Sequence, residues 1–145
     1  EYKAPVAMGS DLKSSVIKIE GDLYQFPAPF SEFTDNGWTV IQQNGDFAAG
    51  QTDSVRVEKN GKKLSLHIAN YADYQTTIDN CVVYQVLVDN ESDVSVLLGS
   101  ETIPVSIGTS KSAVDSIVRD DFKFSETARY YQYSYSEYDV ILTLQ

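Results

Sequence analysis

Hydrophobic and polar residues alternate along most of the chain, which is the pattern of β-strands with one buried face. The clearest case is the stretch 55–68, where two alternating runs flank Asn60-Gly61. Asn-Gly is the preferred dipeptide of the two-residue type I′ turn, because both of its residues tolerate positive φ. The sequence therefore predicts a β-hairpin with its turn at Asn60-Gly61.

Two other strand candidates run into a proline, at Pro27 and at Pro104. Proline disfavours the helical conformation in the residue before it, so both segments are expected to be extended up to the proline. The remaining strands are predicted at 16–19, 38–41, 81–88 and 94–98, and at 130–135 and 139–144 as a closing antiparallel pair. The single cysteine, Cys81, has no partner for an intrachain disulfide and is expected to be a buried strand residue.

Two short helices interrupt the strands. Phe30 and Phe33 share a helical face, and Asn36-Gly37 supplies a left-handed cap at the end of that helix. The second helix is expected to begin after Thr109 or Ser110 as N-cap and to end near Arg119. Its apolar stripe at helical spacing consists of Ala113, Val114, Ile117 and Val118.

These elements predict the α+β class, with an antiparallel sheet and two short helices packed on one face. We expect residues 1–15 to form a flexible tether and 16–145 to form a single α+β domain. The order strand, proline, helix, strands occurs twice, which a diverged internal duplication with subrepeats 16–72 and 73–145 would leave. Chance recurrence of common α+β units is the alternative.

The composition and the net charge mainly exclude classes of function. The chain has 145 residues, of which 42% are hydrophobic, and area scaling lets a chain of this size bury about 68% of its surface without disulfides or metals. Eleven basic against twenty-one acidic residues give a net charge of −10, which repels phosphate backbones and anionic lipids. We therefore expect no nucleic-acid binding. Because no apolar run approaches the length of a membrane span, we also expect no integral membrane span.

The composition also suggests a location. The chain begins at Glu1 rather than at Met, and it combines ten tyrosines and one cysteine with many Ser, Thr and Asn residues. We expect an extracellular or cell-surface anchored protein from which a signal or lipid anchor has been removed.

The stretch 21–33 with Gly37-Trp38, and later Ile103-Pro104 with 107–110 and Val114, resembles a group of uncharacterised exported lipoproteins of Gram-positive bacteria. The second half, with 108–110 before a helix and a tyrosine-rich hairpin after it, also resembles small lipoprotein domains of β-lactamase-inhibitor-like layout. In that layout a helical layer packs on an antiparallel sheet. Members of these groups mostly bind proteins or have no known role, so the resemblance supplies no catalytic residues.

Candidate chemistry is sparse. His67 is the only histidine and alternates away from the apolar face of its strand, and no Gly-x-Ser-x-Gly turn, phosphate loop or thiolate cluster is present. The segments 35–37 and 89–93 offer oxygen ligands, but they do not match the calcium-loop pattern, and turn chemistry explains them. We therefore expect no catalytic residues, no metal ligands and no cofactor.

The tyrosines are the most informative surface feature. By the strand period of two, Tyr131, Tyr133 and Tyr135 fall on one face of their strand, and Tyr138 flanks the row. We expect this face to cover the apolar stripe of the second helix, because the opposite face would otherwise bury amide and hydroxyl groups. In the alternative, the row with Tyr138 is an exposed aromatic binding surface.

The sequence therefore favours a non-enzymatic exported or cell-surface binding or accessory domain. Its expected partner is another extracellular or envelope protein. Two other function classes stay open: an envelope-associated hydrolase using acidic residues, and a structural spacer domain.

Overall fold

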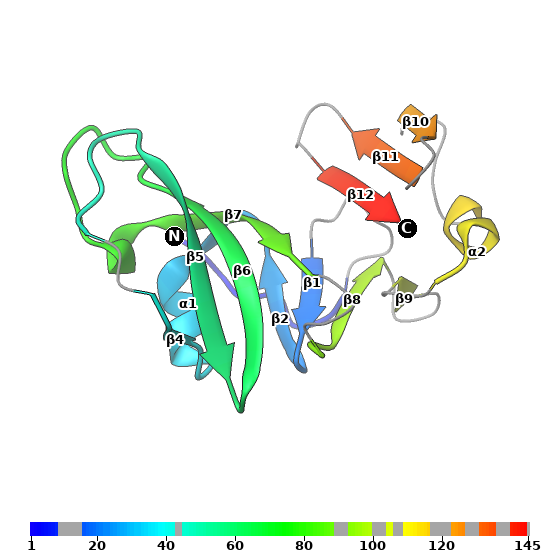
Figure 1. Ribbon diagram of the computed structural model, residues 1–145, viewed down its shortest axis with the longest axis horizontal. Helices are drawn as coiled ribbons and strands as arrows, with labels where there is room; N and C mark the ends of the chain where they lie inside the picture. The colour runs from blue at the N-terminus through cyan, green and yellow to red at the C-terminus, as the bar shows by residue number, and fades with distance from the viewer. Residues whose placement is uncertain are drawn as a thin grey trace.

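The computed structural model describes residues 1–8, 16–42, 45–88, 93–99, 104–105, 109–116, 123–126, 131–135 and 140–144. In these ranges the chain forms twelve strands, two α-helices and one 3-10 helix, and the paired strands are antiparallel. The predicted α+β class with antiparallel sheet and two short helices is confirmed. The strands are divided among three sheets rather than gathered in one (Figure 1).

The largest sheet has five strands in the order β3-β7-β6-β5-β4. Their bounds are β3 (Ala28–Pro29), β4 (Thr39–Val40), β5 (Thr52–Lys59), β6 (Lys62–Ala69) and β7 (Val82–Leu87). Alternate side chains of the central hairpin are at most 1% exposed: Val55, Val57, Leu64, Leu66 and Ile68. One face of this sheet is therefore the main wall of the core.

The predicted hairpin is confirmed. Strands β5 and β6 pair from Thr52↔Ala69 to Lys59↔Lys62. Between them Asn60 and Gly61 have φ of 52° and 79°. These are the positive values that a type I′ turn requires at both central residues.

Helix α1 (Phe30–Asp35) is also confirmed, with Phe30 and Phe33 buried and Gly37 at a φ of 97°. Trp38 follows directly, is 1% exposed, and donates its backbone N–H to the Phe33 carbonyl at 3.0 Å. Strand β4 is shorter than the predicted 38–41, because Trp38 is used to close the helix rather than to pair with β5.

The strand predicted at 81–88 is shorter and less buried than expected. Cys81 precedes β7 and follows the 3-10 helix η2 (Ile78–Asn80). Its thiol is free and buried, and burial raises its pKa. Tyr84 is the extra residue of a β-bulge, since His67 pairs with Gln85 and Ile68 with Val83, and Tyr84 is 38% exposed.

The second sheet has the order β2-β1-β8-β9. Its strands are β1 (Val16–Ile19), β2 (Asp22–Gln25), β8 (Val96–Gly99) and β9 (Pro104–Val105). Strand β2 ends before Pro27 as predicted, and the Phe26–Pro27 peptide bond is cis. The N-terminal segment reaches this sheet, because the Tyr2 hydroxyl accepts the Gln25 backbone N–H at 3.0 Å.

The third sheet contains β10 (Lys123–Glu126), β11 (Tyr131–Tyr135) and β12 (Val140–Leu144) in sequence order. The pairing of β11 with β12 confirms the predicted closing pair, whereas β10 was not predicted. Before it, α2 (Lys111–Asp115) begins as predicted, with the Ser110 hydroxyl accepting the Ala113 N–H at 3.3 Å. The rest of the predicted second helix, 117–119, lies outside the described residues.

Each α-helix is followed by three strands that pair in sequence order, β4-β5-β6 after α1 and β10-β11-β12 after α2. This is the repeated order of elements that the sequence analysis found. The internal duplication itself, with its subrepeats 16–72 and 73–145, stays a prediction, as does the tether.

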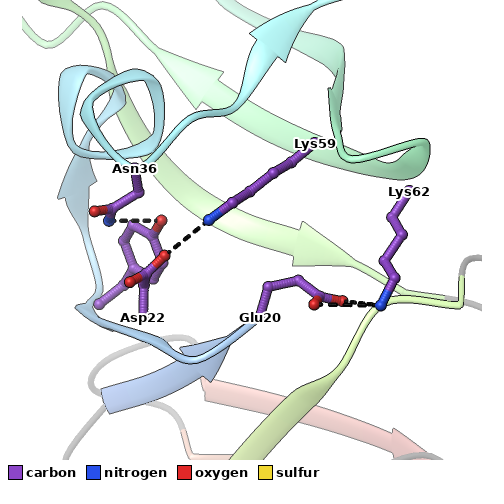
Figure 2. Close-up of polar contacts among 6 residues, drawn as sticks. Glu20, Asp22, Asn36, Lys59 and Lys62 are labelled. Carbon is purple, nitrogen blue, oxygen red and sulfur yellow. Dashed lines mark hydrogen bonds and ion pairs between the residues drawn. The ribbon is translucent and has the colours of Figure 1, made fainter.

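Two β-turns meet where the five-stranded sheet approaches the second sheet, and two ion pairs join them (Figure 2). Lys59 Nζ lies 3.1 Å from Asp22 Oδ2, and Lys62 Nζ lies 3.2 Å from Glu20 Oε1. Glu20 Oε1 also accepts the Ser95 backbone N–H at 2.8 Å. We name Glu20, Asp22, Lys59 and Lys62 the turn clasp.

The contacts of the turn clasp change the pKa of one of its members, Glu20. Burial alone would raise the pKa of Glu20, but the hydrogen bond from the Ser95 N–H and the Lys62 ammonium outweigh burial, and the net pKa is lowered. The ionised form of Glu20 is therefore more stable in the folded protein than in the unfolded chain.

We expect Gly61→Val to lower the free energy of unfolding by about 1 kcal/mol or more, because a β-branched residue resists the positive φ of this turn. Urea unfolding measures the change. Gly45→Val is the matched control, since Gly45 is exposed, has open space around its Cα and is not at a positive φ. Equal loss in the two variants would contradict a conformational cause.

The lowered pKa of Glu20 predicts a stability that depends on pH. A carboxyl group with a lowered folded-state pKa stabilises the fold above its unfolded pKa of about 4.3, and this contribution is lost as pH falls through the folded pKa. Glu20→Gln should lower the free energy of unfolding by about 1 kcal/mol at pH 7. The variant should also flatten the decline below about pH 5, as urea titrations across pH would show. Glu1→Gln is the control, and an acid decline identical to wild type in Glu20→Gln would refute the role of this group.

Candidate binding site

The row predicted as a core face or binding surface lies on β11, the central strand of the third sheet. By register Tyr133 stands opposite Phe124 of β10 and Leu142 of β12. In the same register Tyr131 pairs with Glu126 and Leu144, and Tyr135 pairs with Val140. The side chains of Tyr131, Tyr133 and Tyr135 and the whole of Tyr138 lie outside the described residues, so both readings of the row stay predictions.

The structure presents a different pair of tyrosines at the surface. Tyr71 and Tyr74 are each 65% exposed, more than any other aromatic residue among those whose burial the structure describes. Both belong to residues 70–77, which connect β6 to η2 and which we name the tyrosine loop. Two large apolar rings thus stand in solvent in one short segment.

A single buried side chain holds the backbone of this loop. Asn70 is 1% exposed, and its Nδ2 lies 3.1 Å from the Phe47 carbonyl oxygen, 3.0 Å from that of Ala48 and 2.7 Å from that of Tyr74. Its Oδ1 accepts the Ala72 backbone N–H at 2.9 Å. Because both ends of the amide are hydrogen-bonded to backbone, Asn70 fixes the path of the chain through both tyrosines.

A second loop supports the first. Residues 45–51, the supporting loop, enter β5 beside the end of β6 (Figure 1). Phe47 and Thr76 exchange two backbone hydrogen bonds of 2.8 and 2.9 Å, and the Phe47 side chain is buried in the core. At the surface Gln75 Nε2 donates to Asp46 Oδ2 at 3.1 Å. The two loops therefore form one unit with a buried anchor.

This unit is acidic. The two loops contain Asp46 and Asp73, both exposed, and no Lys or Arg. The lysines of the same hairpin, Lys59, Lys62 and Lys63, lie at its opposite end. Seven residue steps along β5 separate the two ends by about 23 Å.

Other reactive groups do not gather here. His67 lies on the face of the five-stranded sheet opposite the buried residues, as predicted, but it is half-buried rather than exposed, with its ring 6.0 Å from that of Tyr84. The Cys81 thiol is buried. Within the described ranges, no group of three or more His, Cys, Asp or Glu residues is placed to hold a metal ion.

The sequence analysis missed Tyr71 and Tyr74 because they follow no periodic pattern. They are three residues apart between a strand and a 3-10 helix, where neither strand nor α-helix spacing applies. One signal was available: Asn70 directly follows the last apolar residue of β6 and precedes a short polar stretch, as loop-closing asparagines do.

No protein-family model, curated protein or solved structure matches this chain. The resemblance to exported lipoproteins of Gram-positive bacteria, and that of the second half to domains of β-lactamase-inhibitor-like layout, therefore stay predictions. None of the helices in the described ranges is both long enough and apolar enough to cross a membrane.

Asn70→Asp tests the anchor of the tyrosine loop. The carboxylate is isosteric with the amide but places an oxygen against three carbonyl oxygens, so we expect a loss of about 3 kcal/mol or more in the free energy of unfolding. Urea unfolding measures it, and amide hydrogen exchange in residues 70–77 should accelerate. Asn80→Asp is the matched control, because Asn80 is exposed and makes a single side-chain contact of 3.5 Å to Thr77. Equal losses in the two variants would contradict the anchoring role.

Proposed function

We propose that this chain is a non-enzymatic binding domain of an exported or cell-surface protein, and that it binds another protein through the tyrosine loop. One observation carries the proposal: Tyr71 and Tyr74 are each 65% exposed on a backbone that a buried side chain holds in place. Two large rings that are each 65% exposed leave most of their apolar area in water, whereas a protein partner can bury both.

Tyrosine suits this role for physical reasons. Its ring offers a large apolar area with only two side-chain torsions to restrict, and its hydroxyl can form a hydrogen bond at the rim of an interface. A backbone that is already ordered in the free protein lowers the entropy loss on binding. The hydrogen bonds of Asn70 supply that order.

The tyrosine-rich composition with one cysteine supports placement outside the cell. The sparse catalytic chemistry of the sequence supports a binding role over hydrolysis. A structural spacer would not require two exposed tyrosines on an anchored loop.

The proposal is tested by photo-crosslinking. A benzophenone amino acid replaces Tyr74 in the full chain, which is then irradiated with the envelope and extracellular fraction of the producing organism. We expect a discrete crosslinked protein that excess wild-type chain competes away. The double variant Tyr71→Ala/Tyr74→Ala should compete at least tenfold less well, as expected when central aromatic contacts are truncated.

The same benzophenone placed at Tyr84 is the matched control, since Tyr84 is exposed on the sheet face rather than on the loop. A spacer predicts no competed product from either position. Equal crosslinking from both positions, or equal competition by the double variant, would exclude the tyrosine loop as the binding site.

A further inference from the structure

Building on the proposed function, we propose that the segment bound at the tyrosine loop is cationic and carries arginine. Two kinds of group in the loop unit point to this chemistry: the side chains of Tyr71 and Tyr74, which are each 65% exposed, and the exposed acidic residues Asp46 and Asp73. Both attract positive charge, and they occur within two loops tied by hydrogen bonds.

The aromatic faces favour a cation directly. The π-system of tyrosine carries negative charge density on its face, and a guanidinium or ammonium group over the ring is attracted to it. Arginine is the stronger candidate, because its planar guanidinium stacks on rings while its N–H groups still donate to carboxylates. Asp73 is the residue immediately before Tyr74, and both are exposed, so the tyrosine loop offers a carboxylate and an aromatic ring in one short segment.

The distribution of charged residues indicates that the electrostatic potential around the two loops is negative. The two loops contain no Lys or Arg, and the chain as a whole carries −10. On the two strands that the loops adjoin, Arg56 Nη1 lies 3.2 Å from Ser65 Oγ. Lys59 and Lys62 are paired in the turn clasp, and Lys63 lies beside the same turn, at the end of the hairpin away from the loops. A basic segment is therefore drawn toward the loop end of the hairpin, and an acidic one is repelled from it.

A neutral ligand such as a glycan could also stack on the tyrosines, but it would gain nothing from the carboxylates. The two chemistries differ in one measurable respect. Binding of a cation weakens as salt rises and when Asp73 is neutralised, whereas stacking of a neutral ring system does not.

The test uses the full chain and a fluorescein-labelled peptide of alternating glycine and arginine, with fluorescence anisotropy as the readout at about 0.15 M salt. Tyr71→Leu/Tyr74→Leu removes both π faces without changing the net charge. We expect it to weaken binding about fivefold to thirtyfold, from two exposed cation–π contacts. Tyr71→Phe/Tyr74→Phe retains the faces and should bind within about twofold of wild type.

Tyr84→Leu is the control for loss of an exposed tyrosine elsewhere and should leave the affinity unchanged. Asp73→Asn should weaken binding about twofold to fivefold and reduce its dependence on salt. Melting temperatures of all variants verify folding, which these exposed positions are not expected to affect.

Three results would overturn the inference. The first is no binding of the arginine peptide at about 1 mM, and the second is equal binding of a glycine-glutamine peptide, which would indicate a neutral ligand. The third is unchanged affinity in the double leucine variant, which would mean that the peptide responds only to net charge. If the crosslink at position 74 succeeds while the arginine peptide fails, the proposed binding function stands and only its cationic partner is rejected.

Discussion

The contact between Tyr24 and Phe33 is the one on which the arrangement of the five-stranded sheet and the second sheet depends. Tyr24 is fully buried, and its ring stacks on Phe33 with centroids 4.2 Å apart and planes 14° from parallel. The hydroxyl accepts from Asn36 Nδ2 at 2.9 Å, and burial raises the pKa of Tyr24 to about 12. One side chain thus joins β2 of the second sheet to α1 and the core of the first.

The turn clasp follows from this contact. Asp22 lies two residues before Tyr24, so packing of the ring carries the β1–β2 turn toward the tip of the β5–β6 hairpin (Figure 2). The ion pairs of the clasp are partly exposed, with side-chain exposures from 19% to 36%. Pairs of this kind contribute little to stability individually, so the clasp orients the two turns while the apolar contact supplies most of the free energy.

The two ends of the β5–β6 hairpin are used differently. At the turn end, lysines are neutralised by carboxylates from the other sheet. At the loop end, the buried amide of Asn70 donates toward the carbonyl oxygens of Phe47, Ala48 and Tyr74 and accepts the Ala72 N–H. It thereby ties the two loops together where the chain leaves the sheet. This polar anchor allows two tyrosines to stand outside the core on an ordered backbone, in loops that also carry the exposed residues Asp46 and Asp73.

The elements that could be predicted from the sequence are those that residues close together in the chain specify. The hairpin could be predicted because Asn60-Gly61 and the alternation on both sides specify one turn and one register. Helix α1 could be predicted because Phe30, Phe33 and Gly37 define its apolar face and its end within eight residues. The burial of Cys81 was likewise predictable from its apolar neighbours.

Features that depend on contacts between residues far apart in the chain became known only from the tertiary structure. The strands separate into three sheets, and the clasp joins residues 37 and 42 positions apart. The candidate site belongs to this second group, because the exposure of Tyr71 and Tyr74 depends on Asn70 reaching Phe47, 23 residues earlier in the chain. Periodicity reports which face of an element is buried, but a loop has no period, so its side chains can be placed only once the contacts that hold its backbone are known.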